Sequence, residues 1–205
     1  DIVIDFDDRG RVKALRRIKK KEKKANLYLD STLIDKNVMI RIIDWYKDNS
    51  YIDVIDAIAE NLGRLSAGAY EFTGFAGSIN NIKDYMEVSK ALFDSKVIKE
   101  LFMGDRLIHT KIHDAPPVKY LDNAKVKNAL VGTGSIIDGS IENSIICRNV
   151  VIEEGAKIKN SIIMPLCYIG KKAVLENAIC EKNVTIEEGE VHKGTATKPA
   201  ILSND

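Results

Sequence analysis

The chain has few of the residues that build disulfide frameworks, metal centres and membrane spans. It contains three cysteines and three histidines among 205 residues, and no cysteine pair has the C-x-x-C spacing of redox and zinc sites. Each cysteine lies in an apolar run, which favours small buried side chains over ligands or disulfides; they are Cys147, Cys167 and Cys180. No apolar run is long enough to cross a bilayer, and no signal peptide is recognisable. We therefore expect a cytoplasmic protein.

The chain also lacks an excess of either charge. Thirty-one Lys and Arg residues against 30 Asp and Glu give a formal net charge of +1, which disfavours nucleic acid and membrane surfaces as partners. With 45% apolar residues, the chain can bury a core as one domain or two small ones. Because Asp1 immediately precedes a predicted strand, we expect the chain to be the downstream piece of a longer protein.

An internal repeat fills the second half. Its pattern is a charged residue, Asn, a small residue and two apolar residues, and the copies span 127–131, 142–146, 159–163 and 176–180. The spacing between successive copies is nearly constant, with further short apolar segments between them. Three short strands of about six residues in each turn predict a parallel β-helix of hexapeptide repeats. A regular coil of this kind is usually a scaffold.

The Asn of each copy is predicted to form one corner of this β-helix. Asparagine tolerates the left-handed conformation that a sharp corner needs, the small residue fits the bend, and the isoleucines fill the interior. The predicted corner residues are Asn128, Asn143, Asn160 and Asn177.

The first half alternates between strand and helix patterns, which is typical of an α/β domain. Strands are predicted over 2–6, 11–18, 25–29, 69–75 and 106–112, and helices over 35–48, 52–62 and 80–99. Ala115, Pro116 and Pro117 then form a stiff linker. We therefore predict two domains, 1–114 and 115–205.

These features together resemble the glucose-1-phosphate adenylyltransferases, also called ADP-glucose pyrophosphorylases. The matching segments are Phe72-Thr-Gly-Phe75 with Ile82-Lys-Asp-Tyr85, Ala115-Pro-Pro117, and the Asn-Ser-Ile-Ile coils with Ile169-Gly170. The resemblance implies the C-terminal part of a nucleotidyltransferase α/β domain joined to a left-handed parallel β-helix, in an oligomer that makes ADP-glucose for glycogen or starch. The family's Gly-rich ATP-binding loop has no counterpart here, and we expect it upstream of Asp1.

Within the matched region, several positions depart from the family's substrate cleft. Ile18 aligns with a lysine that binds the sugar phosphate, although Lys19 or Lys20 could slip into that place, and Ser78 aligns with an aspartate that helps to hold Mg²⁺. Ala25 and Asn26 stand in a changed Ser-Met-Gly-Ile-Tyr run. Mg²⁺ prefers carboxylate oxygens, and nucleotidyl transfer depends on it. We therefore expect no catalytic residues, metal or cofactor in this chain, with Mg²⁺ required only by a catalytic partner.

The pattern of losses resembles the regulatory subunits of bacterial glycogen synthesis, which assemble with a catalytic adenylyltransferase subunit. A homo-oligomer is the alternative assembly. The resemblance also implies a sugar-phosphate effector near the junction of the two domains, where Arg106, Lys111 and Lys119 are candidate ligands.

Other functions stay open from the sequence. One is an active adenylyltransferase whose lost groups are replaced by neighbours. Another is a β-helix acyltransferase with a histidine as general base, but His109, His113 and His192 lie outside the regular coils. A third is purely structural, because apolar coil edges must be capped or paired, and an oligomer interface does both.

Overall fold

The computed structural model describes residues 2–18, 25–48, 53–104, 108–109, 111 and 114–204. The chain divides into two compact units, Asp1–Ala76 and Gly77–Asp205, and each is described by itself. The domain boundary was predicted between 114 and 115, shortly before the first strand of the coil at Lys119–Tyr120, whereas the two units divide between Ala76 and Gly77. The second unit begins earlier because a helix that precedes the coil packs against it.

The first unit contains a hairpin and two helices. Strands β1 (Ile2–Phe6) and β2 (Val12–Arg17) pair antiparallel. The Asp7 carboxylate closes their turn by accepting from the backbone N–H groups of Arg9 and Arg11. Helices α1 (Lys36–Tyr46) and α2 (Val54–Glu60) follow, so the predicted elements 2–6, 11–18, 35–48 and 52–62 are confirmed. Their core is built around Ile42, Ala57 and Ile58.

Two strands predicted for this unit are wrong. Segment 69–75 has no strand, and segment 25–29 contributes only an isolated bridge between Val3 and Leu27. A strand exists only where a neighbouring strand takes its hydrogen bonds. Within the described part of this unit, β1 and β2 are the only strands that supply such a ladder.

The helix predicted over 80–99 is broken into α3 (Ile82–Ala91) and α4 (Ser95–Phe102). The Asp94 carboxylate accepts from the backbone N–H of Lys96 and starts a second helix, because a carboxylate at the N-cap satisfies an otherwise unpaired donor. Helix α3 packs Tyr85 and Met86 against an outer face of the coil that includes Ile162 and Ile179. The strand predicted over 106–112 falls partly outside the described residues, and 108, 109 and 111 are not in a strand.

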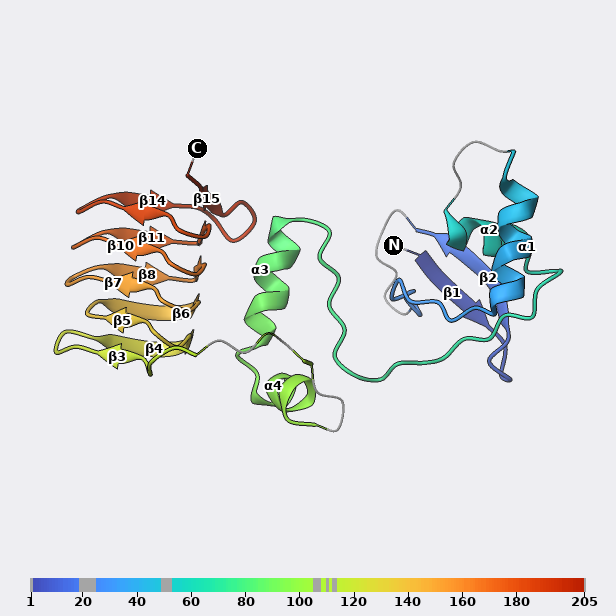
Figure 1. The fold of residues 1–205 in the computed structure, drawn as a ribbon, viewed down its shortest axis with the longest axis horizontal. Helices are drawn as coiled ribbons and strands as arrows, with labels where there is room; N and C mark the ends of the chain where they lie inside the picture. Colours follow the sequence, from blue (N-terminus) through green and yellow to red (C-terminus); the bar gives the residue numbers. More distant parts are fainter. Residues whose placement is uncertain are drawn as a thin grey trace. The chain divides into compact units, whose positions relative to one another are not determined.

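The coil is a parallel β-helix, seen as a stack of turns from yellow-green to red in Figure 1. One sheet runs through β3 (Lys119–Tyr120), β5 (Ile136–Ile137), β7 (Val151–Ile152), β10 (Tyr168–Ile169) and β13 (Thr185–Ile186). The other joins β4 (Lys125–Val131), β6 (Ser140–Ile146), β8 (Lys157–Lys159), β9 (Ile162–Ile163), β11 (Val174–Glu176), β12 (Ala178–Cys180), β14 (Val191–Lys193) and β15 (Ala200–Leu202). All of these pairs are parallel.

The strand register follows the sequence repeat. Ile136 pairs with Val151, which pairs with Tyr168, which pairs with Thr185. The steps between these partners equal the steps between the repeat copies that begin at Lys127, Glu142, Lys159 and Glu176. The expected fold class, α/β elements followed by a parallel β-helix of hexapeptide repeats, is therefore confirmed.

The interior of the β-helix is filled by columns of aliphatic side chains. Ile137, Ile152, Ile169 and Ile186 form one such column and are 0–3% exposed. Burial of each side chain of this size contributes about 1.5–3 kcal/mol. Since every coil repeats the same contacts, the columns set both the packing and the register.

The corners are made by residues in the left-handed conformation. Asn128, Asn143, Asn160 and Asn177 have φ of 48°, 49°, 51° and 48°, as a corner asparagine requires. Two further columns of positive φ mark the other corners: Gly134, Asn149, Leu166 and Asn183, and Gly155, Lys172 and Gly189. Only the first of these three columns was predicted from the sequence repeat.

The small residue after the corner asparagine has a second role. The Ser161 hydroxyl donates to the Lys159 carbonyl (2.7 Å) and accepts from the Ala178 backbone N–H (3.0 Å) on the next coil. Ser144 bonds to Glu142 and Ser161 in the same way. These buried hydroxyls link neighbouring coils where the backbone ladder turns.

Among the described residues, no helix is both long enough and apolar enough to cross a membrane.

Candidate functional site

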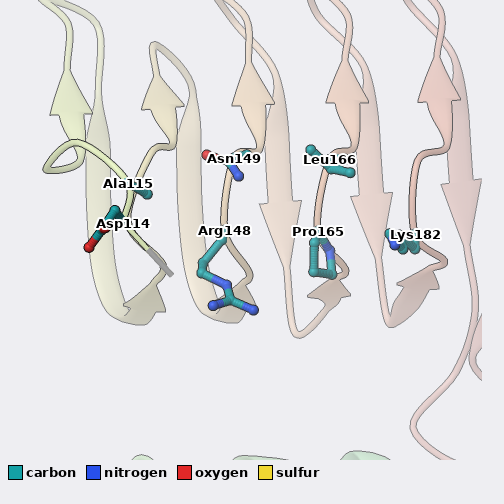
Figure 2. Close-up of a pocket in the computed structure, with 7 residues that line it drawn as sticks. All are labelled: Asp114, Ala115, Arg148, Asn149, Pro165, Leu166 and Lys182. Atoms are coloured by element: carbon teal, nitrogen blue, oxygen red, sulfur yellow. The ribbon is translucent and has the colours of Figure 1, made fainter. Parts of the chain in front are cut away.

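A cavity of about 370 Å³ lies on one corner of the β-helix. Figure 2 shows residues from successive coils along it, with the linker at one end. Its lining residues are Asp114, Ala115, Arg148, Asn149, Pro165, Leu166 and Lys182. Because all of them belong to the second unit, the cavity is defined within that unit alone.

The corner conformation positions the lining residues. Asn149 and Leu166, with φ of 55° and 67°, lie in one of the left-handed columns. The Leu166 backbone N–H donates to the Arg148 carbonyl (3.1 Å), and the Asn183 N–H donates to the Pro165 carbonyl (3.0 Å). These bonds hold the residue before each corner at a fixed height, so Arg148, Pro165 and Lys182 form a row across three coils.

The cavity combines two cations with one carboxylate. Arg148 is half-buried, whereas Lys182 and Asp114 are exposed. Among the residues that the structure describes, none of the three forms an ion pair. Guanidinium and ammonium groups donate charge-assisted hydrogen bonds to phosphate, while a carboxylate accepts hydrogen bonds from hydroxyl groups. The chemistry suits a ligand that carries both groups.

Two of the three residues predicted to bind an effector are described by the structure. Arg106 lies outside the described residues. Lys111 and Lys119 are exposed, and neither lines the cavity. A signal for the cavity did exist in the sequence: a cation, Asn and Val occur as Arg148-Asn149-Val150 and again, two turns of the coil later, as Lys182-Asn183-Val184.

The substrate-cleft positions are divided between the two units. Ile18 and Ala25 are half-buried and Asn26 is exposed in the first unit, where the Asn26 carbonyl accepts from the Ile4 N–H (2.8 Å). Ser78 belongs to the second unit and is exposed.

Ser78 lies among polar residues that are hydrogen-bonded to one another at the start of α3. The Ser78 hydroxyl accepts from the Asn80 amide (2.9 Å). The nearby Asp84 carboxylate accepts from the Asn80 backbone and the Asn81 side chain, and so serves the start of α3. No group of three or more potential metal ligands among His, Cys, Asp and Glu occurs within the described ranges.

The prediction that all three histidines lie outside the regular coils is wrong for His192. This residue lies on β14 in the last coil, in register with Leu175 of β11, and its Nε2 is 2.9 Å from the Glu190 carboxylate. His109 is exposed, and His113 lies outside the described residues.

Two of the three cysteines are fully buried and lie close in sequence to residues that line the cavity. Cys167 follows Leu166, Cys180 comes shortly before Lys182, and both belong to the main core of the coil. Cys147 is half-buried, and burial raises the pKa of its thiol.

Comparison with known proteins confirms the resemblance seen in the sequence. Residues 116–195 match the family described as GlmU-like, C-terminal hexapeptide. The chain is 32% identical over 133 residues to the glycogen biosynthesis protein GlgD of Bacillus subtilis, and 36% identical over 130 residues to GlgD of Geobacillus stearothermophilus. It is also 31% identical over 107 residues to a glucose-1-phosphate adenylyltransferase of Bacillus cytotoxicus.

These matches cover different shares of the proteins compared. They include 65%, 63% and 52% of this chain but only 38%, 38% and 28% of the respective relatives. The chain therefore spans less than half the length of the curated relatives it matches.

Proposed function

We propose that this chain is part of a non-catalytic regulatory subunit of glucose-1-phosphate adenylyltransferase, which modulates ADP-glucose synthesis for glycogen by assembling with a catalytic subunit. The relatives named as glycogen biosynthesis proteins support it, because their matches extend over 133 and 130 residues, against 107 and 123 residues for the adenylyltransferases of Bacillus cytotoxicus and Bacillus thuringiensis. Since the chain covers 38% of those two relatives, the proposal concerns the full-length parent.

The observation that carries the proposal is the chemistry at Ser78. A neutral hydroxyl that already accepts from the Asn80 amide (2.9 Å) is a poor ligand for Mg²⁺, which binds carboxylates and phosphate oxygens. Without the metal, the phosphate charge of a nucleotidyl transfer is not offset. Ile18 supports the same conclusion, because an aliphatic side chain cannot donate to a sugar phosphate.

The cavity at the β-helix corner is the proposed effector site. The cations Arg148 and Lys182 provide donors for a phosphate, and the Asp114 carboxylate provides an acceptor for sugar hydroxyls. A sugar phosphate carries both groups, which agrees with the effector class implied by the family resemblance. Lys111 and Lys119, the effector ligands predicted from the sequence, do not line this cavity and remain a separate proposal.

Assembly with a catalytic subunit is supported by apolar side chains on the outside of the coil. Ile136 and Tyr168 are 38% and 40% exposed and lie in one outward row with Val151. Exposed apolar rows of this kind are stabilised when a partner covers them. The partner is the catalytic subunit in the proposed assembly, and a second copy of the parent in the alternative one.

The test is ADP-glucose formation from Mg-ATP and glucose 1-phosphate by the full-length parent, alone and mixed with the catalytic adenylyltransferase of the same organism. We expect no turnover by the parent alone, and raised activity or a changed effector response in the mixture. Turnover by the parent alone would contradict the proposal and support an active enzyme in which other groups compensate for Ile18 and Ser78.

The effector site has its own test. We expect Arg148→Gln in the full-length parent to weaken binding of a sugar phosphate such as glucose 1-phosphate, measured by calorimetry. The loss of a charged hydrogen bond is worth about 1.5–3 kcal/mol, or roughly ten- to a hundredfold in Kd. Lys182→Gln should have a smaller effect because Lys182 is exposed. Lys119→Gln is the matched control, and an equal loss there would place the ligand elsewhere.

A further inference from the structure

Cys167 and Cys180 meet inside the β-helix. Their Sγ atoms are 3.6 Å apart, and the residues are 1% and 0% exposed. Cys167 immediately precedes β10, and Cys180 ends β12. The two thiols are therefore in contact across the interior of a turn.

This contact replaces an aliphatic contact. Val150, Cys167 and Val184 share one column, because the residues that follow them pair in register. Cys180 pairs with Ile163 on one side and with Leu202 on the other. The neighbouring coils thus show that valine and isoleucine or leucine satisfy the packing, so packing alone does not explain two thiols in one layer.

The two sulfur atoms differ in acidity. The Cys180 thiol donates to Cys167 Sγ, and this hydrogen bond, the largest contribution, lowers the pKa of Cys167 to about 7 with further help from the backbone near Val184. The same hydrogen bond, followed by burial, raises the pKa of Cys180. Cys167 is therefore the better nucleophile, since the thiolate is the reactive form of cysteine.

We propose that Cys167 and Cys180 form a reversible redox pair, which hydrogen peroxide converts to an intramolecular disulfide. The Cys167 thiolate attacks one peroxide oxygen, the O–O bond breaks, and a sulfenic acid and hydroxide form. The Cys180 sulfur then attacks Cys167 Sγ, the S–O bond breaks, the Cys180 proton is lost, and water leaves. In total, two thiols and one peroxide give one disulfide and two water molecules.

Burial determines which oxidant can act. A small neutral peroxide can reach the pair through local opening of a coil, whereas thiol–disulfide exchange requires a bulky mixed disulfide inside the core. Glutathione disulfide should therefore react much more slowly than peroxide.

Oxidation also removes a hydrogen bond next to a residue that lines the cavity. The Cys167 thiol donates to the Glu181 carbonyl (2.9 Å), and a disulfide has no proton to donate. Glu181 adjoins Lys182, which lines the cavity. The redox pair itself stands independently of the proposed function.

The experiment uses the full-length parent, treated with peroxide, blocked with an alkylating reagent in denaturant and cut with trypsin. Cleavage after Lys159, Lys171, Lys172 and Lys182 places Cys167 in peptide 160–171 and Cys180 in peptide 173–182, while Cys147 lies in peptide 128–148. We expect mass spectrometry to find peptides 160–171 and 173–182 joined, with loss of two hydrogen atoms, and to find them separate after reduction.

Two variants make the result specific. Cys167→Val introduces the residue that both neighbouring coils have at this position. In this variant, Cys180 should remain a free thiol after peroxide treatment. Cys147→Ser is the matched control and should leave the joined peptides unchanged. Two free thiols after peroxide, oxidation of Cys167 beyond the sulfenic acid, or a bond that includes Cys147 would overturn the proposal.

Discussion

The two units of the chain differ in how directly their sequence specifies their structure. In the β-helix, one set of contacts recurs with every turn of the coil, so the column through Ile137, Ile152 and Ile169 defines register and core together. In the first unit, the contacts of Ile42 with Ala57 and Ile58 occur once. Repetition makes a pattern readable from sequence, whereas a contact made once leaves no periodic signal.

The largest expected effect comes from removing one member of an interior column. We expect Ile169→Ala, at a fully buried position, to lower the free energy of unfolding by about 2–5 kcal/mol, measured by urea denaturation. Ile136→Ala, on an outward position that is 38% exposed, is the control and should cost much less. Equal losses at the two positions would contradict the assignment of inner and outer faces.

A glycine pair compares the packing of the two units. An added Cβ at Gly170 would lie 2.8 Å from backbone atoms of Glu187 and Glu188, whereas at Gly63 nothing lies within 4 Å. We expect Gly170→Ala to destabilise the coil by about 1–3 kcal/mol, because backbone of the next coil must move. Gly63→Ala should change stability by less than about 1 kcal/mol. Amide hydrogen exchange, resolved by peptide, would show where each substitution acts. If Gly170→Ala increased exchange in the first unit, local packing in the coil would not be the cause.

An effect of similar size is expected at the serine that links two coils. Ser161→Ala leaves the Ala178 backbone N–H without its acceptor (3.0 Å), and an unsatisfied buried donor costs about 1–3 kcal/mol. Ser161→Thr keeps the hydroxyl and is the informative comparison in thermal unfolding. If both variants lose the same stability, the space available to the side chain, and not its hydrogen bond, explains why serine is found at this position.

The smallest expected effect is in the row of alternating charges beside the asparagine corner. Lys127, Glu142, Lys159, Glu176 and Lys193 pair in sequence along the coils, with ion pairs at 3.7 Å (Lys159–Glu142) and 3.9 Å (Lys193–Glu176). Glu142→Lys places three like charges in succession. We expect a loss of about 0.2–1 kcal/mol at low salt that disappears at high salt, with Glu142→Gln as the neutral control.

The redox pair and the cavity could not be predicted from the sequence. Burial of Cys167 and Cys180 could be predicted from their apolar neighbours, but their contact could not, because two residues on different sides of a turn meet only when the path of the whole turn is known. The cavity has the same origin, since Arg148 and Lys182 come into one row only after two turns. The break between α3 and α4 depended on whether Asp94 acts as a cap or as an exposed helix residue.

The β-helix, its register and the asparagine corner could be predicted from the amino-acid sequence, because each depends on local residue types repeated at a nearly fixed interval. The sequence also determined that a serine stands at position 78 and an isoleucine at position 18. Three features could be seen only in the folded chain: segment 69–75 forms no strand, α3 covers the outer face at Ile162 and Ile179, and the thiols of Cys167 and Cys180 are in contact. These features depend on which surfaces come into contact, and the type of a single residue does not specify which distant residue it contacts.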